Sequence, residues 1–269
     1  MSSYIAQSPN SARKQSTTKP RRKPPNGTRF LRPSSILKHS SDMKFLTLAP
    51  IDANYTFRAM LQTLSRPGTI EALALSDQSQ CLPETALMLA LIDVETKFAV
   101  LSSLEDIDAK IWARLLSSAS GAPQAELPKA EWVLSFGEPS TDELNSLARG
   151  SANEPEAGCR LIVACDKLSQ FASDTSDTSD TSDTSDTSDS RLHDSTRAST
   201  TIGLRGPGVN GQITLHVDGL SENFFATLAK INNSFPAGVD VWLCDQLGHL
   251  AAISRSTEFN VMQFQETIA

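Results

Sequence analysis

The sequence predicts an α/β fold in which a mixed β-sheet is flanked by helices. Short runs of β-branched and apolar residues alternate along the chain with segments whose apolar residues recur at helical spacing. Apolar residues also make up 39% of the 269 residues, which is enough to build a substantial core. We therefore expect a single domain over residues 43–269, preceded by a tail over residues 1–42.

Helices and strands alternate through the first half of this domain. A helix is predicted over Ile51–Ser65, where the apolar stripe consists of Phe57, Met60, Leu61 and Leu64, and Arg66-Pro67-Gly68 ends it. A second helix, from Pro83 to Leu91, is apolar on nearly all sides, as is typical of a helix buried between layers. Further helices are expected at 106–117 and 141–148, the latter capped by Thr141, and strands at 69–75, 97–101, 132–136 and 159–165.

The segment Gly206–Gly211, with the sequence GPGVNG, lies between two predicted strands at 201–205 and 212–217. It matches the pattern G-x-G-x-x-G, but a dinucleotide-binding loop of that kind is followed by a helix, and here a strand follows. We favour a wide hairpin turn, with a phosphate-binding loop formed by Gly206, Gly208 and Gly211 as the alternative. Beyond it we expect a helix over 222–231 capped by Ser221, and strands at 239–245 and 250–257.

The charge is unevenly distributed between the tail and the domain. Residues 1–42 carry +8 and the whole chain −7, so the remainder carries −15, a charge that repels nucleic acid. The tail is rich in Ser, Thr and Pro, and we expect it to be disordered. Two alternatives stay open: the tail is an arm for nucleic acid or membrane surfaces, or translation starts at Met43. No apolar run suits a signal peptide or a membrane span, so a membrane is not an expected partner. The negative charge of the domain makes nucleic acid an unexpected partner as well.

An Asp-Thr-Ser repeat fills Asp174–Ser190 and defines an insertion at about residues 169–199. It holds no apolar residue, so we expect a disordered loop. Calcium binding is the weaker alternative, because the repeat contains no glycine to shape a binding turn. Long loops cost little entropy, so joining Leu168 directly to Thr200 is expected to leave the melting temperature and the assembly unchanged.

The remaining chemistry points to anion binding rather than to a metal or a nucleophile. The cysteines, at 81, 159, 165 and 244, lack CxxC spacing, which indicates reduced, mostly buried thiols in a cytoplasmic protein. The histidines lack ligand-spaced partners, so no metal site is expected, and neither a P-loop nor a GxSxG motif occurs. Guanidinium groups suit phosphate and phosphonate oxygens, so the candidates are Arg58, Arg66, Arg205 and Arg255, each with a structural ion pair as the alternative.

Five segments occur in an order that resembles a known family. They are FRAML with SRPGTI at 57–70, EPEAGCRLIV at 154–163, GPGVNG at 206–211, FPAGVDVWLCD at 235–245 and LAAISRST at 250–257. Together they resemble the PhnH family, a subunit of the bacterial carbon–phosphorus lyase system, over about residues 46–257 apart from the insertion. Where the family usually has Pro-Arg-Thr, this chain has Ser254-Arg255-Ser256, so proline does not stiffen the approach to Arg255.

The resemblance implies a fold similar to that of pyridoxal-phosphate-dependent transferases, without the cofactor. Lys230 is the only lysine in the last third of the chain, and nothing around it resembles a cofactor site. The resemblance also implies a cytoplasmic homodimer that joins subunits of the PhnG, PhnI, PhnJ and PhnL types. That assembly transfers the ribose triphosphate of ATP to an alkylphosphonate and releases adenine, before a separate radical iron–sulfur subunit breaks the carbon–phosphorus bond. The resemblance assigns no catalytic residue to this chain.

Two functions from different classes follow. One is an accessory subunit of this ribosyltransferase assembly. The other is a stand-alone nucleotide- or phosphonate-binding enzyme that uses the 206–211 loop, Arg205 and Arg255 to hold the ligand.

Overall fold

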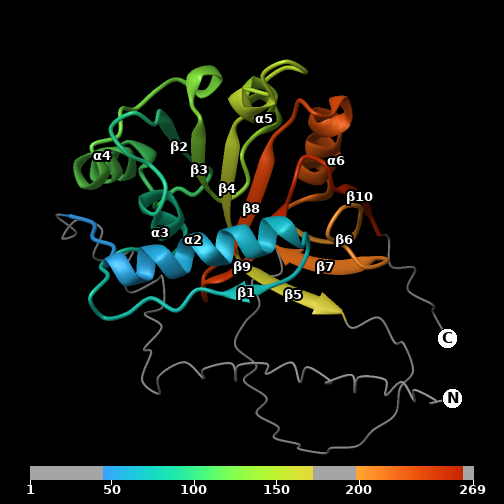
Figure 1. Cartoon of the computed structure of the whole chain (residues 1–269), viewed down its shortest axis with the longest axis horizontal. Coiled ribbons are helices and arrows are strands. Elements are labelled where there is room, and N and C mark those ends of the chain that lie inside the picture. Colours follow the sequence, from blue (N-terminus) through green and yellow to red (C-terminus); the bar gives the residue numbers. More distant parts are fainter. Residues whose placement is uncertain (1–44, 172–197, 263–269) are drawn as a thin grey trace, which may run out of the picture.

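A computed structural model describes residues 45–171 and 198–262, so the tail before residue 45 and most of the Asp-Thr-Ser insertion lie outside the described residues. The helices are α2 (Pro50–Ser65), α3 (Pro83–Leu89), α4 (Ala109–Ser120), α5 (Thr141–Ser146) and α6 (Glu222–Ile231). The strands are β1 (Glu71–Ala72), β2 (Phe98–Ser102), β3 (Trp132–Phe136), β4 (Arg160–Cys165), β5 (Lys167–Phe171), β6 (Ser199–Arg205), β7 (Ile213–Asp218), β8 (Asp240–Asp245), β9 (His249–Ile253) and β10 (Glu258–Val261). Figure 1 shows their arrangement.

The strands form two sheets. The larger sheet has the order β1-β9-β8-β4-β3-β2, in which β8, β4, β3 and β2 run parallel to one another. Strand β9 runs antiparallel to both of its neighbours, β8 and β1. The smaller sheet has the order β10-β6-β7-β5 and is antiparallel throughout. The predicted α/β class with a mixed sheet is therefore confirmed.

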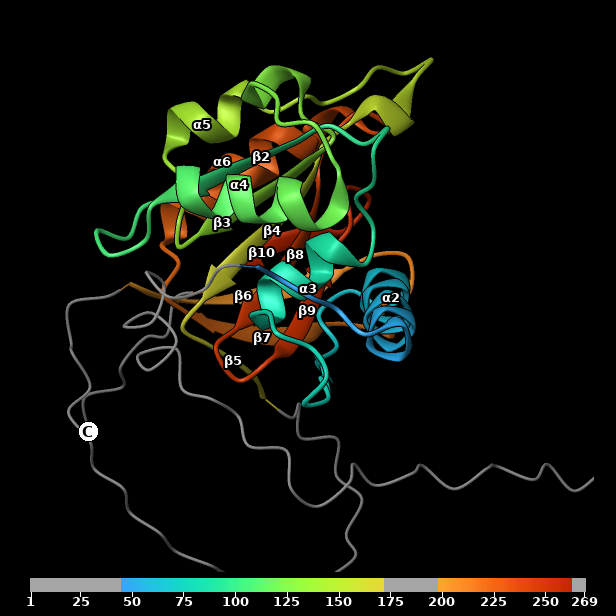
Figure 2. The same cartoon turned by 90° about the vertical axis from the view of Figure 1, so that its left-hand side faces the viewer.

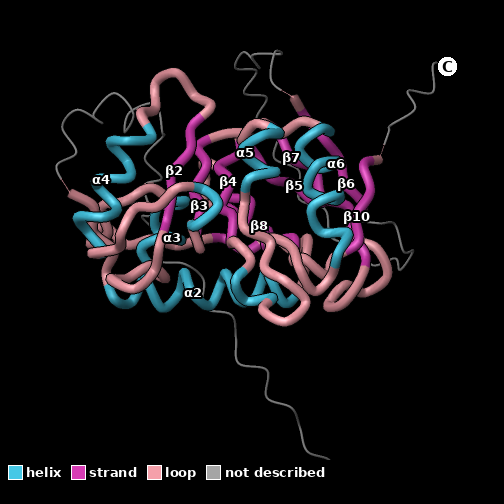
Figure 3. The backbone as a smooth tube through the Cα atoms, turned by 90° about the horizontal axis from the view of Figure 1, so that it is seen from above, coloured by secondary structure: helices cyan, strands magenta, loops and turns pink. Residues whose placement is uncertain are grey.

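The large sheet is covered on both faces, as its apolar parallel strands require. Side chains of α2, α3 and α4, including Met60, Leu87 and Trp112, pack in one core cluster. The other core cluster contains Leu144 of α5 and Phe224 of α6 together with the inner face of the small sheet. In the view from above, α2 lies along one border of the molecule, away from α5 and α6 (Figure 3). Figure 2 again shows α2 at the periphery.

Local sequence signals explain where most helices begin and end. Pro50 opens α2, and Gly68 adopts a φ of 80° in the turn that follows it. Asp108 caps α4 by accepting a bond from the backbone of Lys110, and Gly121 ends that helix in the left-handed conformation. Ser221 caps α6 as predicted. The predicted cap of α5 was one residue late, because Ser140 rather than Thr141 forms a capping box with Glu143.

Several other predicted boundaries differ from the structure. The strand expected at 69–75 shrinks to Glu71–Ala72, and the one expected at 250–257 ends at Ile253, after which the chain turns into β10. Neither β5 nor β10 is predicted by the sequence. On α2, Met60 is buried as expected, but Phe57 and Leu61 are exposed, and Asp52, Thr56 and Thr63 complete the buried face. The prediction of a helix buried between layers is confirmed by α3, in which Ala86, Leu87 and Met88 are fully buried.

The expectation that Leu168 can be joined directly to Thr200 is wrong. Strand β5 occupies Lys167–Phe171, so the start of the expected insertion at residue 169 falls inside a strand. Leu168 and Thr200 both pair with Val217, one on each side of β7. They are therefore two strand spacings apart, about 10 Å, which one peptide bond cannot span.

A longer replacement of the insertion is expected to preserve the fold. Because β5 and β6 both run antiparallel to β7, they are parallel to each other and need a crossover connection of about a dozen residues. Replacing residues 173–197 by a Gly-Ser linker of about 12 residues should therefore leave the melting temperature unchanged. The direct Leu168–Thr200 junction serves as the comparison and should lower it, as measured by thermal unfolding. Equal stability of the two variants would contradict the role of β5.

Candidate functional site

Three of the sequence motifs meet at one place in the fold. The backbone N–H of Gly68 donates to the carbonyl of Ala252 at 3.1 Å, which fixes the end of α2 against β9. The hairpin loop between β6 and β7 lies against the same helix end, because a Cβ on Gly208 would overlap the carbonyl oxygen of Ser65. At Gly206, a Cβ would lie 3.3 Å from the carbonyl oxygen of Ser256. Segments 65–68, 206–211 and 254–257 are therefore neighbours.

The loop 206–211 is a hairpin turn, as favoured from the sequence. Leu204 pairs with Ile213 across the antiparallel strands β6 and β7. Gly206, Gly208 and Gly211 have φ values of 122°, 80° and 74°, which explains the need for glycine at each position. Close packing of Gly208 on α2 accounts for that glycine without a ligand.

Gly208→Ala is expected to destabilise the protein by about 2–4 kcal/mol and to lower the melting temperature by roughly 5–10 °C. The added methyl group would meet both an unfavourable backbone conformation and the carbonyl of Ser65. Gly211→Ala is the matched control, because Gly211 has a similar φ but no atom within 4 Å of its Cβ position. It should cost only about 1 kcal/mol. Equal losses for the two variants would show that contact with α2 is unimportant.

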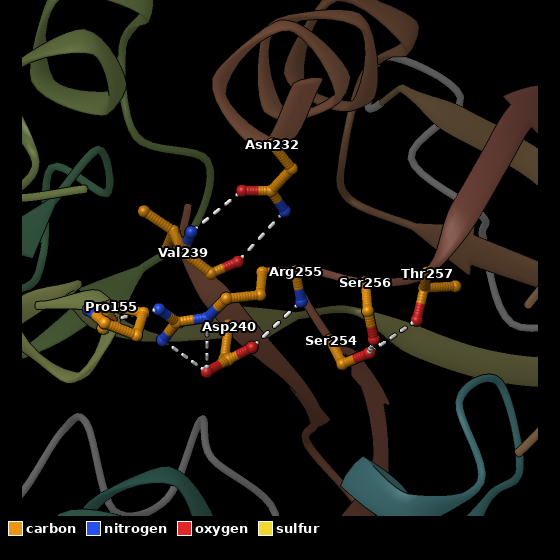
Figure 4. A network of polar contacts seen from close by, with 8 residues as sticks. All are labelled: Pro155, Asn232, Val239, Asp240, Ser254, Arg255, Ser256 and Thr257. Carbon is orange, nitrogen blue, oxygen red and sulfur yellow. Dashed lines mark hydrogen bonds and ion pairs between the residues drawn. The ribbon is translucent and has the colours of Figure 1, made fainter. Parts of the chain in front are cut away.

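Arg255 lies beside this junction, and its side chain points toward Asp240 and Pro155 (Figure 4). Its Nε and Nη2 atoms donate to Oδ2 of Asp240 at 3.1 and 2.6 Å, and its backbone N–H donates to Oδ1 at 2.8 Å. The remaining nitrogen, Nη1, donates to the carbonyl of Pro155. The two charged side chains are 12% and 15% exposed. Every nitrogen of the guanidinium group is therefore engaged within the protein.

The surroundings of Arg255 are also held together by hydrogen bonds. Ser254 Oγ lies 3.0 Å from Ser256 Oγ and 2.8 Å from Thr257 Oγ1, so hydroxyl groups stiffen the turn where proline is absent (Figure 4). Asn232 exchanges two hydrogen bonds with the backbone of Val239, just before β8. Asp240 begins β8, so this network lies at the amino ends of the parallel strands. Ligands of open α/β sheets usually bind outside the carboxyl ends of the strands, so the Arg255 network lies at the opposite end from the usual ligand site.

The other candidate arginines are exposed at the surface, whereas Arg255 is mostly buried. Arg205 donates through Nε and Nη2 to Oε1 of Gln212 at 2.9 and 2.6 Å. Arg58 and Arg66 are exposed on α2 and just beyond its end. The structure therefore brings the motif segments together, and anion binding by these arginines stays a prediction.

The carboxyl end of β8 holds a polar cluster that the sequence does not reveal. The side chain of Asp245 is fully buried, and it accepts bonds from the backbone N–H groups of Leu168, Leu247 and His249 at 3.2, 2.9 and 2.9 Å. Its Oδ2 also lies 2.8 Å from Nδ1 of His249. A carboxylate only accepts, so Nδ1 carries the proton and Nε2 is directed elsewhere. The sequence favours solvated strand ends for Asp240 and Asp245, with pairing to an arginine as the alternative. Solvation is wrong at both positions, because Asp245 is fully buried and Asp240 is mostly buried in its ion pair with Arg255, as the alternative expects.

A family model described as "Bacterial phosphonate metabolism protein (PhnH)" matches residues 46–260. The chain belongs to the PhnH family. A search of curated proteins found no match. Family membership confirms the resemblance drawn from the five motifs, and it assigns the chain to bacterial phosphonate metabolism.

Within the matched PhnH region, the cysteine thiols are suited to packing rather than to reaction. Cys159, Cys165 and Cys244 are buried, as expected, and Cys81 is half-buried. Burial raises the pKa of the Cys81 and Cys159 thiols to about 12. It also raises the pKa of Cys165 and Cys244 well above the usual value, so these thiols stay protonated.

The PhnH chain shows neither a metal cluster nor a spanning helix among its described residues. In residues 45–171 and 198–262, His, Cys, Asp and Glu side chains do not gather in any group of three that could hold a metal ion. Of the helices described there, none has the length and apolar character needed to cross a bilayer.

Glu84, near the start of α3, should make the stability of this PhnH protein depend on pH. Loss of hydration raises the pKa of its carboxyl group from 4.5 to about 7, although its backbone N–H lowers it slightly. The folded protein therefore favours the protonated form. The contribution of the protonated Glu84 side chain to the stability of the folded protein is complete below pH 4.5 and is lost as the pH rises through about 7.

Glu84→Gln is accordingly expected to remove about 2 kcal/mol of this pH dependence, after allowance for the exposed part of the side chain. The variant should gain stability relative to the unmodified protein as the pH rises from 4.5 to about 7, measured by urea unfolding. Glu105→Gln, at an exposed position, is the control and should leave the profile unchanged. Parallel profiles for Glu84→Gln and the unmodified protein would contradict the assignment.

Proposed function

We propose that the chain is an accessory subunit of the assembly that transfers ribose triphosphate from ATP to an alkylphosphonate. In that reaction the bond between adenine and C1′ of the ribose breaks, a phosphonate oxygen bonds to C1′, and adenine is released. The observation that carries the proposal is the PhnH family match over residues 46–260, which covers nearly all described residues. The subunit would act with partners of the PhnG, PhnI, PhnJ and PhnL types.

The arrangement of the candidate residues supports an accessory role over independent catalysis. Arg255 is committed to Asp240 and to the carbonyl of Pro155, and Gly208 accommodates the backbone of α2. A stand-alone enzyme that grips a triphosphate with Arg255 would first have to break a mostly buried ion pair. We therefore rank that alternative second.

Three further features complete the proposal. The isolated chain would be a homodimer with twice the mass of the 29.0 kDa subunit. It would contain no pyridoxal phosphate, since the sequence around Lys230, in the last turn of α6, does not resemble a cofactor site. Its buried free thiols suit a cytoplasmic location.

The deciding experiment measures adenine release from ATP and methylphosphonate by the partner subunits, first without this chain and then with it restored. We expect release to depend on the chain. Unchanged release in its absence would refute the accessory role in transfer. Calorimetric titration of the isolated chain with ATP or methylphosphonate separates the second candidate, because saturable binding that Arg255→Ala weakens would favour a stand-alone binding protein.

A further inference from the structure

Helix α2 exposes an unusual share of the large apolar side chains. The described residues contain nine exposed large hydrophobic side chains, and four of them lie on this single helix: Ile51, Tyr55, Phe57 and Leu61. Isolated exposed apolar residues are common on protein surfaces, whereas a concentration on one element indicates a contact surface. We call these four residues together with Arg58 the α2 face.

The position of α2 leaves this face available. Its opposite side packs on β9, β1 and α3 through Asp52, Thr56, Met60 and Thr63. The helix runs along the outside of the molecule, and no other described element lies over it (Figure 1). The α2 face is therefore not part of the domain core.

The charges on α2 restrict the kind of partner. The single carboxylate of the helix, Asp52, is buried and bonded to Ser76 and Ser79 at 2.6 Å each. Arg58 is exposed at the middle of the helix, three residues after Tyr55 and three before Leu61, so it lies between apolar side chains. Asn54, which is exposed on the same side of the helix, is uncharged, so the α2 face and its surroundings are largely apolar with one positive charge near the centre.

A second copy of the chain suits this face poorly. A two-fold axis through the middle of α2 would bring Arg58 close to its own copy, and like charges in an interface are repulsive. A different protein that presents an apolar surface with a carboxylate would instead pair with the guanidinium group. Arginine and aromatic residues are also the types that dominate binding energy at interfaces.

We propose that the α2 face docks another subunit of the phosphonate assembly, through an apolar patch that places a carboxylate opposite Arg58. This inference rests on the proposed function, and it implies that the homodimer forms through a different surface. Phe57, Leu61 and Arg58 supply the contacts whose loss should matter most.

The test uses the full chain and the purified PhnG-, PhnI- and PhnJ-type subunits of the same system. Phe57→Gln/Leu61→Gln and Arg58→Glu are each expected to weaken binding to these subunits by about 30-fold or more. Glutamine and glutamate keep good helix propensity, so melting temperatures should be retained. The mass of the isolated dimer, measured by light scattering, should also be unchanged.

Helix α4 offers matched controls. Ile111 is 37% exposed, close to the 38% of Phe57, and Arg114 is exposed on the same helix. Ile111→Gln and Arg114→Glu should leave binding unaltered.

Three outcomes overturn the proposal. If the α2 variants become monomeric, the face is the self-association surface. If they lower the melting temperature in the full chain but not after removal of residues 1–42, the face packs against the chain's own N-terminal segment. If they bind the other subunits as well as the unmodified chain does, this inference alone fails. Failure of the unmodified chain to bind any of these subunits would overturn the proposed function as well.

Discussion

Asp245→Ala is expected to lower the free energy of unfolding by about 3–5 kcal/mol, one of the two largest single-residue effects we anticipate in this fold. The side chain is completely buried, and its two oxygens accept bonds from three backbone N–H groups and the His249 ring. Alanine would leave these donors without an acceptor at a buried site, where water does not readily take the place of the carboxylate oxygens. Urea unfolding followed by circular dichroism measures the loss.

Two variants show whether the bonding network, rather than the loss of any charge, causes the effect. Asp106→Ala removes a carboxylate from an exposed position and should change stability by less than about 0.5 kcal/mol. His249→Ala removes one of the four donors and should cost about 1–2 kcal/mol. A loss below about 1 kcal/mol for Asp245→Ala would contradict its role in tying β5 to the turn between β8 and β9.

The fold is predictable from the sequence wherever local signals agree. The strand Trp132–Phe136 and the helix Glu222–Ile231 are predicted with the observed bounds, because the first is a short apolar run and the second follows a capping serine. Strand β5 is missed because Asp166 alone separates it from β4, so the chain enters the second sheet without a turn signal. Strand β10 is missed because its residues Glu258–Val261 are only partly apolar.

The site is less predictable because its contacts join residues that are distant in the sequence. Asp240 and Asp245 occupy equivalent-looking positions at the two ends of β8. Only the fold brings the backbone of Leu168, 77 residues away, to Asp245, and the carbonyl of Pro155, 100 residues away, to Arg255. A sequence identifies arginine as suited to phosphate, but it does not show whether a carboxylate of the same chain already holds the guanidinium group.

The second large effect is expected at Arg255, where Arg255→Met should lower the free energy of unfolding by about 3–5 kcal/mol. Methionine replaces the aliphatic part of the side chain, so the loss would come mainly from Asp240, which would be left mostly buried without its partner. Arg205→Met is the matched control, because the Arg205 side chain is exposed and, within the described part of the chain, bonds to the uncharged Gln212. It should change stability by less than about 0.5 kcal/mol in thermal or urea unfolding.

The double variant Arg255→Met/Asp240→Asn distinguishes a structural pair from a ligand site. If the two side chains stabilise the fold through each other, removing both should cost at least about 1 kcal/mol less than the sum of the single losses. Each single variant leaves one charge without its partner, whereas the double variant leaves none. If Arg255 instead serves a bound anion, Arg255→Met should remain stable and lose only ligand affinity. A stable Arg255→Met protein would thus refute the structural assignment and return Arg255 to the list of residues that hold a phosphate or phosphonate group.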